Sequence, residues 1–181
     1  GRNYSIASLM KDEYLELHIK KYEGGALSPW LFNEVQINDM IDIQGPSGYC
    51  FYTPSKTPLL LIGNGTGLSP LIGIIKKALL EKHIDKIHLI HYAREKSQVY
   101  YQNEIHALCE KHSNLTYEIL VKNEKSHSTL IEMSKKIVKD NKNHTIYLAG
   151  SDNLINLLRK QLYIAGASLS SIYSDAFVPH Q

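Results

Sequence analysis

The sequence predicts an α/β protein in which a doubly wound parallel sheet follows a shorter region of strands and turns. Three observations lead to this fold class. From residue 59 onward, short apolar runs alternate with segments of helical periodicity. A glycine-rich turn separates the first apolar run from the first helical segment. Residues 1–52 lack this alternation and carry turn signals instead.

The second region, residues 53–181, is expected to form one domain around the sheet. We expect strands at 59–62, 87–93, 115–121, 145–149 and 171–175, and helices at 68–82, 102–111, 129–139 and 153–165. Strands that alternate with helices of this length form parallel sheets. Right-handed crossovers bring the carboxyl ends of all the strands to one edge, and ligands bind at that edge.

The first region, residues 1–52, is expected to be a separate and smaller unit. We expect strands at 2–8, 14–21 and 40–44, and a short helix at 28–35 capped by Ser28. Three strands and one small helix do not close a barrel or bury much core. The region therefore looks like the second half of a larger unit, joined to the second domain by a linker at 53–57.

The turn after the first apolar run suits a phosphate group. Gly63, Gly65 and Gly67 alternate there and leave room for a ligand beside the main chain. Ser69 is expected to cap the following helix and Pro70 to occupy its first turn. A helix N-terminus offers free N–H groups and a partial positive charge to an anion. The alternative is a tight strand-to-helix turn that binds nothing.

Two motifs in the first region suit a ligand with a pyrophosphate and a flat ring. On a strand, Arg2 and Tyr4 share one face, where an arginine fork pairs with phosphates and a tyrosine ring lies against a heterocycle. Ser5 lies on the opposite face. The glycine pair ending at Gly25 precedes the helix capped by Ser28 and suits a second phosphate. The alternatives are an ordinary barrel strand and a simple helix cap.

Charge and cysteine content limit the kinds of partner and the compartment that we expect. The net charge of +2 does not favour nucleic acid or an anionic membrane. No apolar run approaches the roughly 20 residues that cross a bilayer. Cys50 and Cys109 lie far apart without the spacing of metal ligands, so we expect no metal site. Two thiols without a partner favour the reducing cytoplasm.

Taken in order, the motifs resemble those of the ferredoxin–NADP reductase-type flavoprotein family. They are Arg-x-Tyr-Ser from Arg2, Gly-Gly-x-x-Ser up to Ser28, Gly-Pro-x-Gly from Gly45 and Gly-x-Gly-Thr-Gly-x-x-Pro from Gly63. Residues 147–152 and 175–177 resemble the closing motifs of that family. The resemblance implies part of an antiparallel flavin-binding barrel, followed by a nucleotide-binding α/β domain. The barrel strands upstream of Arg2 are absent, so we expect this chain to bind FAD poorly.

The resemblance also implies a role for each motif residue. The FAD site would contain Arg2, Tyr4, Ser5, Gly25 and Ser28. The catalytic candidates at the flavin are Ser5, near flavin N5, and Phe177, from the C-terminus. The pyridine nucleotide would lie on Gly65, Thr66, Gly67 and Pro70. Its adenosine end would lie near Arg94 and Tyr101, and its nicotinamide side near Gly150, Ser151 and Asp152.

The function implied is an oxidoreductase that passes electrons from NAD(P)H through FAD to an acceptor outside this chain. That acceptor would be an iron–sulfur domain, a ferredoxin, a haem domain or an oxygenase. Glu95, which sits between Arg94 and Lys96, favours NADH over NADPH. Ala149 replaces a cysteine that many family members carry beside the nicotinamide, so we expect slower or differently tuned transfer.

Two other functions remain open at this point. One is a non-catalytic nucleotide-binding or regulatory module of the same fold, which Ala149 and the missing half of the barrel favour slightly. The other is a flavin reductase that uses free flavin as a substrate. Asp175, in the last expected strand, is interpreted as a surface or capping carboxylate. The sequence does not indicate an oligomeric state.

Overall fold

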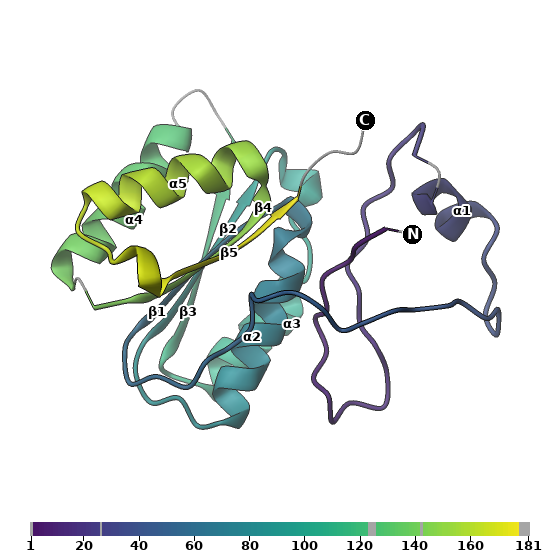
Figure 1. Cartoon of the computed structure of the whole chain (residues 1–181), viewed down its shortest axis with the longest axis horizontal. Coiled ribbons are helices and arrows are strands. Elements are labelled where there is room, and N and C mark those ends of the chain that lie inside the picture. Colours follow the sequence, from purple (N-terminus) through teal and green to yellow (C-terminus); the bar gives the residue numbers. More distant parts are fainter. Residues whose placement is uncertain (1, 26, 123–125, 142, 178–181) are drawn as a thin grey trace.

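The computed structural model describes residues 2–25, 27–122, 126–141 and 143–177 (Figure 1). A single parallel sheet has the strand order β3-β2-β1-β4-β5, which confirms the doubly wound α/β fold. The strands are β1 (Leu59–Asn64), β2 (Ile87–Ala93), β3 (Leu115–Val121), β4 (Thr145–Ser151) and β5 (Ile172–Phe177). The helices around the sheet are α2 (Leu68–Leu80), α3 (Gln102–Lys111), α4 (Ser126–Asp140) and α5 (Asp152–Ile164).

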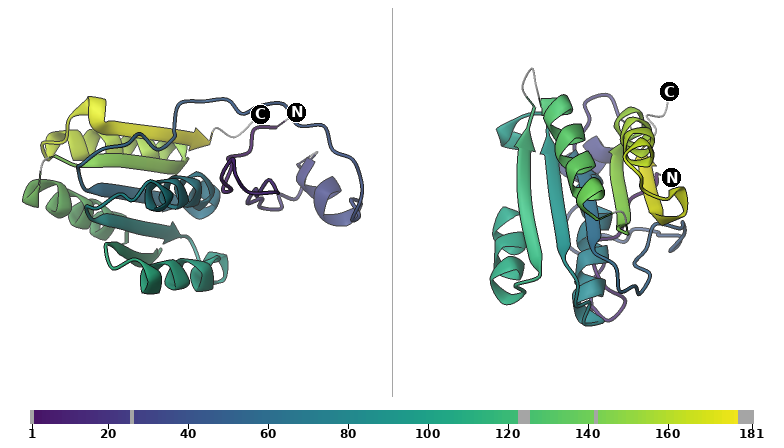
Figure 2. Two further views of the ribbon diagram at one scale, coloured as in Figure 1. Left: turned by 90° about the horizontal axis from the view of Figure 1, so that it is seen from below. Right: turned by 90° about the vertical axis from the view of Figure 1, so that its left-hand side faces the viewer.

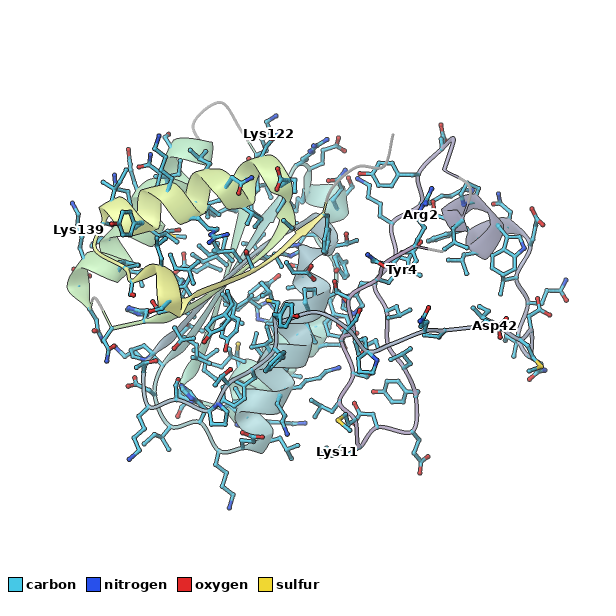
Figure 3. All side chains as sticks on the ribbon, in the orientation of Figure 1. Arg2, Tyr4, Lys11, Asp42, Lys122 and Lys139 are labelled. Carbon is cyan, nitrogen blue, oxygen red and sulfur yellow. The ribbon has the colours of Figure 1, made fainter. Side chains whose placement is uncertain are left out.

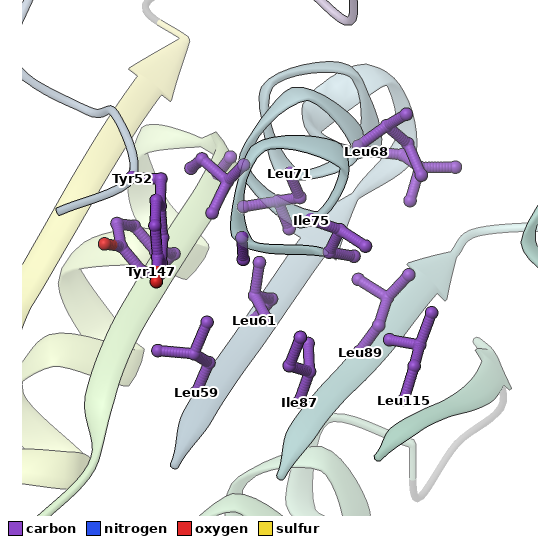
Figure 4. Packing of buried hydrophobic residues seen from close by; sticks show 14 of the residues in the cluster. Tyr52, Leu59, Leu61, Leu68, Leu71, Ile75, Ile87, Leu89, Leu115 and Tyr147 are labelled. Carbon is purple, nitrogen blue, oxygen red and sulfur yellow. The ribbon is translucent and has the colours of Figure 1, made fainter. Parts of the chain in front are cut away.

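Helices cover both faces of this sheet (Figure 2). Leu59 and Leu61 point to the face that packs on α2 and α3, and Leu60 and Ile62 point to the face that packs on α4 and α5. All four side chains are at most 1% exposed. A strand buried on both faces has a continuous apolar sequence, which is why the run 59–62 stands out. Figure 4 shows the core on the α2 face.

The strand order reverses at β1: the chain passes from β1 to β2 and β3 on one side, and then crosses back to β4 and β5 on the other side. At the carboxyl end of β1, Gly63 is paired with His91 on β2 and with Ala149 on β4. Ala149 is paired in turn with Asp175 on β5. These four residues form one row across the sheet at the position where doubly wound folds bind ligands.

The three strands expected in residues 1–52 are wrong. Within the described part of this region, strand pairing is limited to one antiparallel bridge between Ile6 and Leu17. An extended segment becomes a strand only when a neighbouring segment completes its hydrogen bonds. Ile37 and Met40 are 93% and 97% exposed, so side chains that would face a barrel core lie open. The short helix is confirmed as α1 (Leu27–Asn33).

Both expected serine caps are also wrong. α1 begins at Leu27, one residue before Ser28, and the Ser28 hydroxyl accepts a hydrogen bond from the Tyr22 N–H at 2.9 Å. α2 begins at Leu68 with no side-chain cap. The reason is that the glycine turn is itself a 3₁₀ turn, Gly65–Gly67, which continues directly into α2. No helix in the described ranges is long and apolar enough to cross a membrane.

Candidate functional site

The glycine turn provides an open cradle at the switch point. Gly65 has φ +55°, and a Cβ placed on it would meet no atom within 4 Å. Gly67 is the opposite case, because its Cβ would lie 2.1 Å from the Ala149 carbonyl oxygen. The turn after β1 therefore packs against β4 at Gly67 and leaves open space at Gly65. Thr66 is half-buried in this turn, and Pro70 is buried in the first turn of α2.

The turn between β4 and α5 forms the second wall of the site. Gly150 has φ +136° and lies so close to Asn64 that its Cβ would be 2.7 Å from the Asn64 Cβ. Ser151 and Asp152 follow it, half-exposed, at the start of α5. Phe177, at the end of β5, is paired with Ser151 in the sheet. The structure thus brings four predicted site residues to the same edge.

Ser5 reaches this edge from the N-terminal segment. Its Oγ donates a hydrogen bond of 2.6 Å to Asp175 Oδ2, and its carbonyl oxygen accepts one of 2.7 Å from Ser69 Oγ. Asp175 is therefore not the surface or capping carboxylate that its sequence position suggests, since it anchors a residue 170 positions away. The signal that would have found it is its strand register, which places it beside Ala149.

Cys50 is a further residue that sequence reasoning did not assign to the site. Burial raises the pKa of its thiol to about 12, and the charge of Asp175 acts in the same direction. The side chain is half-buried and packs against the core of the α2 face. It therefore remains an uncharged thiol at neutral pH. Within the described ranges, no group of three histidine, cysteine or carboxylate side chains is arranged to hold a metal ion.

Four other predicted site residues belong to the region before the sheet. Arg2, which is exposed, and Tyr4, which is half-exposed, are on the N-terminal segment (Figure 3). Ser28 lies in the first turn of α1, and Gly25 precedes that helix. Gly25 and Ser28 are close to each other, since a Cβ on Gly25 would be 3.4 Å from Ser28 Oγ.

The two residues predicted for the adenosine end lie between β2 and α3. Arg94 directly follows β2 and is exposed. Glu95, next to it, accepts a hydrogen bond of 3.3 Å from Ser97. Tyr101 is half-buried and has φ +62°, and its hydroxyl lies 3.3 Å from Lys76 Nζ on α2. The Tyr101 hydroxyl thus contacts Lys76 on α2 and Glu16 on the N-terminal segment.

Fold and site together define a class: a doubly wound dinucleotide-binding domain with a glycine cradle at its switch point. The chain belongs to the ferredoxin–NADP reductase-type flavoprotein family. Residues 61–160 match the oxidoreductase NAD-binding domain family, and residues 1–52 match the oxidoreductase FAD-binding domain family. The resemblance found in the motifs is confirmed.

Similar proteins include reductase components of oxygenase systems. One is the ferredoxin–NAD(P)+ reductase component of the naphthalene 1,2-dioxygenase system of Pseudomonas putida. It is 30% identical over an alignment of 185 residues, gaps included, that covers 99% of this chain and 56% of that protein. The crystal structure of a cytochrome P450 reductase from Amycolatopsis superposes with a TM-score of 0.86 at 25% identity, covering 97% of this chain and 56% of that one. The chain spans about half the length of these relatives.

Proposed function

We propose that the whole protein is an NAD(P)H-dependent flavin oxidoreductase that passes electrons through FAD to a separate acceptor. The observation that carries the proposal is the meeting of Ser5 with Asp175 at the edge that also holds the glycine cradle. The Ser5 carbonyl oxygen also accepts a hydrogen bond from Ser69 Oγ, so a residue of the FAD-binding match contacts a residue of the NAD-binding match at this edge. The acceptor would be a ferredoxin, an iron–sulfur domain, a haem domain or an oxygenase. The relatives include a ferredoxin reductase component, a reductase subunit of an aromatic O-demethylase and a flavohaemoprotein.

The residues of the nucleotide domain fit a pyridine dinucleotide. The open space at Gly65 and the N–H groups of the 3₁₀ turn that precedes α2 would hold the diphosphate. Gly150, Ser151 and Asp152 would border the nicotinamide. Arg94 and Tyr101 would lie toward the adenosine.

The residues that would hold FAD come from both ends of the chain. They are Arg2, Tyr4, Ser5, Gly25 and Ser28, with Phe177 reaching the ring from β5. Bound flavin supplies the chemistry that converts a two-electron donor into single-electron steps. Ser5 is held by Asp175, so its hydroxyl oxygen keeps its lone pairs directed away from that carboxylate. The protein's part is to orient the flavin and the nucleotide, since no residue of the site needs to act as a strong acid or base.

Purification of the whole protein tests the proposal. We expect a yellow protein that NADH bleaches under anaerobic conditions. A colourless protein that binds nucleotide and reduces nothing would establish the non-catalytic alternative instead. A colourless protein that oxidises NADH only with added free flavin would establish a flavin reductase.

We place the domain boundary at residues 52/53. We place the protein in the cytoplasm, where the free thiols of Cys50 and Cys109 stay reduced.

Removal of the Asp175 carboxylate is expected to slow flavin reduction. Asp175→Ala should lower the rate by about 10- to 100-fold while the nucleotide Kd changes by less than about threefold, because an oriented hydroxyl is lost but the cradle remains. Stopped-flow absorbance of the whole protein measures both values. Ser174→Ala is the matched control, since it changes the neighbouring residue of β5. Equal rates in the two variants would contradict this role.

Glu95 is expected to set the preference for NADH. A 2′-phosphate placed near Arg94 would also face the Glu95 carboxylate, and like charges at an exposed site repel by about 1 kcal/mol. Glu95→Gln should therefore raise kcat/KM for NADPH by roughly fivefold and leave that for NADH unchanged. Steady-state assays with both nucleotides measure the change. A parallel rise for NADH would show that Glu95 acts on something other than the 2′-phosphate.

A further inference from the structure

The N-terminal segment contacts α2 through two neighbouring stretches, residues 6–7 (the first arm) and residues 16–18 (the second arm). The Ala7 N–H donates to the Glu16 carbonyl at 2.9 Å, next to the bridge between Ile6 and Leu17. Ala7 is fully buried, and the Ile6 carbonyl oxygen would lie 2.8 Å from a Cβ on Gly73 of α2. The arms therefore touch the helix backbone without an intervening side chain.

A carboxylate on the second arm binds α2. Glu16 Oε2 accepts a hydrogen bond of 2.7 Å from Lys76 Nζ, and Glu16 Oε1 lies 3.1 Å from His18 Nε2. The side chains of Glu16 and Lys76 are each 19% exposed, so water screens the pair only in part. Burial alone would raise the pKa of Glu16, but bonds from Lys76, Tyr101 and His18 outweigh it and bring that pKa to about 2. The carboxylate therefore stays charged at any pH at which the protein works.

The same arm also binds the connection between β2 and α3. His18 Nδ1 lies 2.9 Å from the Tyr100 hydroxyl. We assign the His18 proton to Nε2, which faces Glu16, so that Nδ1 accepts from Tyr100. Burial raises the pKa of Tyr100 well above its usual value, so its hydroxyl keeps the proton that it donates. The next residue, Tyr101, contacts Lys76 through its hydroxyl at 3.3 Å.

These contacts form one connected group, the Glu16 cluster, made of Glu16, His18, Lys76, Tyr100 and Tyr101. It joins α2 seven residues away from Ser69, where Ser5 makes the other polar contact with that helix. Seven residues are roughly two turns, or about 10 Å along the axis. One contact alone would let the N-terminal segment rotate on α2, but two contacts at this spacing fix the angle between that segment and the helix.

We propose that the Glu16 cluster sets the orientation of the flavin-side segment relative to the nucleotide domain, with Glu16 and Lys76 as positioning residues for the transfer. The proposal rests on the proposed function. Reacting atoms must come within about 3 to 3.5 Å with their orbitals aligned, and misplacement by about 1 Å can cost 100-fold in rate. Glu16 and Lys76 lie outside the glycine cradle, so we expect substitutions at these two residues to change the geometry of transfer more than the nucleotide affinity, although Lys76 also contacts Tyr101 at the proposed adenosine end.

Charge variants of the whole protein with FAD bound test the proposal. Lys76→Met and Glu16→Gln should each lower the rate of flavin reduction by NADH about 10-fold, with less than about a twofold change in nucleotide Kd. The long-wavelength absorbance of stacked nicotinamide and flavin should weaken in both. The double variant should be no slower than either single one, and Lys76→Arg should restore most of the rate.

Lys77→Met is the matched control. Lys77 is the next residue of α2 and pairs with Glu81 at 2.7 Å, outside the Glu16 cluster. It should keep the wild-type rate and absorbance. Lys76→Met and Glu16→Gln variants with wild-type rate and absorbance would overturn the proposal, and so would a loss confined to nucleotide Kd.

A second measurement separates this proposal from the proposed function. Proteolysis between residues 8 and 20 should accelerate in Lys76→Met and not in Lys77→Met, whether or not the protein reduces flavin. If wild-type protein fails to reduce flavin but Lys76→Met opens this segment, the proposed function fails and the orienting role of the cluster stands. If proteolysis is equal in the two variants, the orienting role is refuted.

Discussion

Gly67→Ala is expected to abolish nucleotide binding and to destabilise the fold by about 3 kcal/mol, at the upper end of overpacking costs. Its Cβ would lie 2.1 Å from the Ala149 carbonyl oxygen and 2.7 Å from the Gly150 nitrogen. Both atoms are backbone in β4, between β1 and β5, so neither can move like the end of a side chain. The turn would have to move away from β4, which opens the wall of the cradle.

Gly24→Ala is the control for this substitution. Gly24 has φ +82° and open space around its Cβ position, and it lies outside the glycine turn. It carries only the cost of a side chain in the left-handed region, about 1 to 2 kcal/mol. Urea unfolding and NADH fluorescence titration of both variants measure the difference. A Gly67→Ala variant that binds NADH normally and unfolds within about 1 kcal/mol of wild type would show that the turn is pliable.

The nucleotide domain could be predicted closely because its signals are local. The expected strands at 87–93 and 115–121 and the helix at 102–111 have the same bounds as β2, β3 and α3. The signal that predicts each of these elements, an apolar run or a helical spacing, lies within a dozen residues of sequence. Even the largest shift, at the start of α4, is three residues.

The N-terminal segment and the contacts across the site could not be predicted in this way. Strand pairing depends on a neighbour that the local sequence does not specify, and the segment 2–8, for which we expected a strand, makes one bridge. The bond between Ser5 and Asp175 spans 170 residues, and that between Glu16 and Lys76 spans 60. Each residue alone resembles an ordinary surface group. Only the topology shows that the two members of each pair meet.

His91 illustrates how a residue without a motif can matter to the edge of the site. It is fully buried beside Gly63, with its ring 5.6 Å from that of Tyr100 and its Nδ1 3.4 Å from the Tyr117 hydroxyl. Its Nε2 has no hydrogen-bond partner within the described residues, although the Gly65 backbone is near enough to affect the pKa. A buried imidazole in this setting is stable only when it is neutral.

Acidification is therefore expected to weaken the fold through His91. Burial lowers its pKa from 6.5 to about 4, while the Gly65 backbone acts weakly in the opposite direction. Below pH 6.5 the unfolded chain binds a proton at His91 that the folded chain does not bind. The contribution of His91 to the free energy of unfolding is therefore fully present above pH 6.5 and falls until about pH 4. Below that pH both states are protonated and the loss levels off. A shift of this size corresponds to about 3 kcal/mol, as an upper value.

His91→Phe should remove this part of the pH dependence, because phenylalanine fills a similar volume and does not titrate. Urea unfolding at steps from pH 7.5 to 4 gives the slope of stability against pH, which is independent of any packing cost that phenylalanine adds. Burial also lowers the pKa values of His83 and His88, so a smaller slope of the same sign should remain. If the curves of wild type and His91→Phe ran parallel across this range, His91 would bind its proton at the same pH in the folded and unfolded states, and its burial beside Gly63 would carry no electrostatic cost.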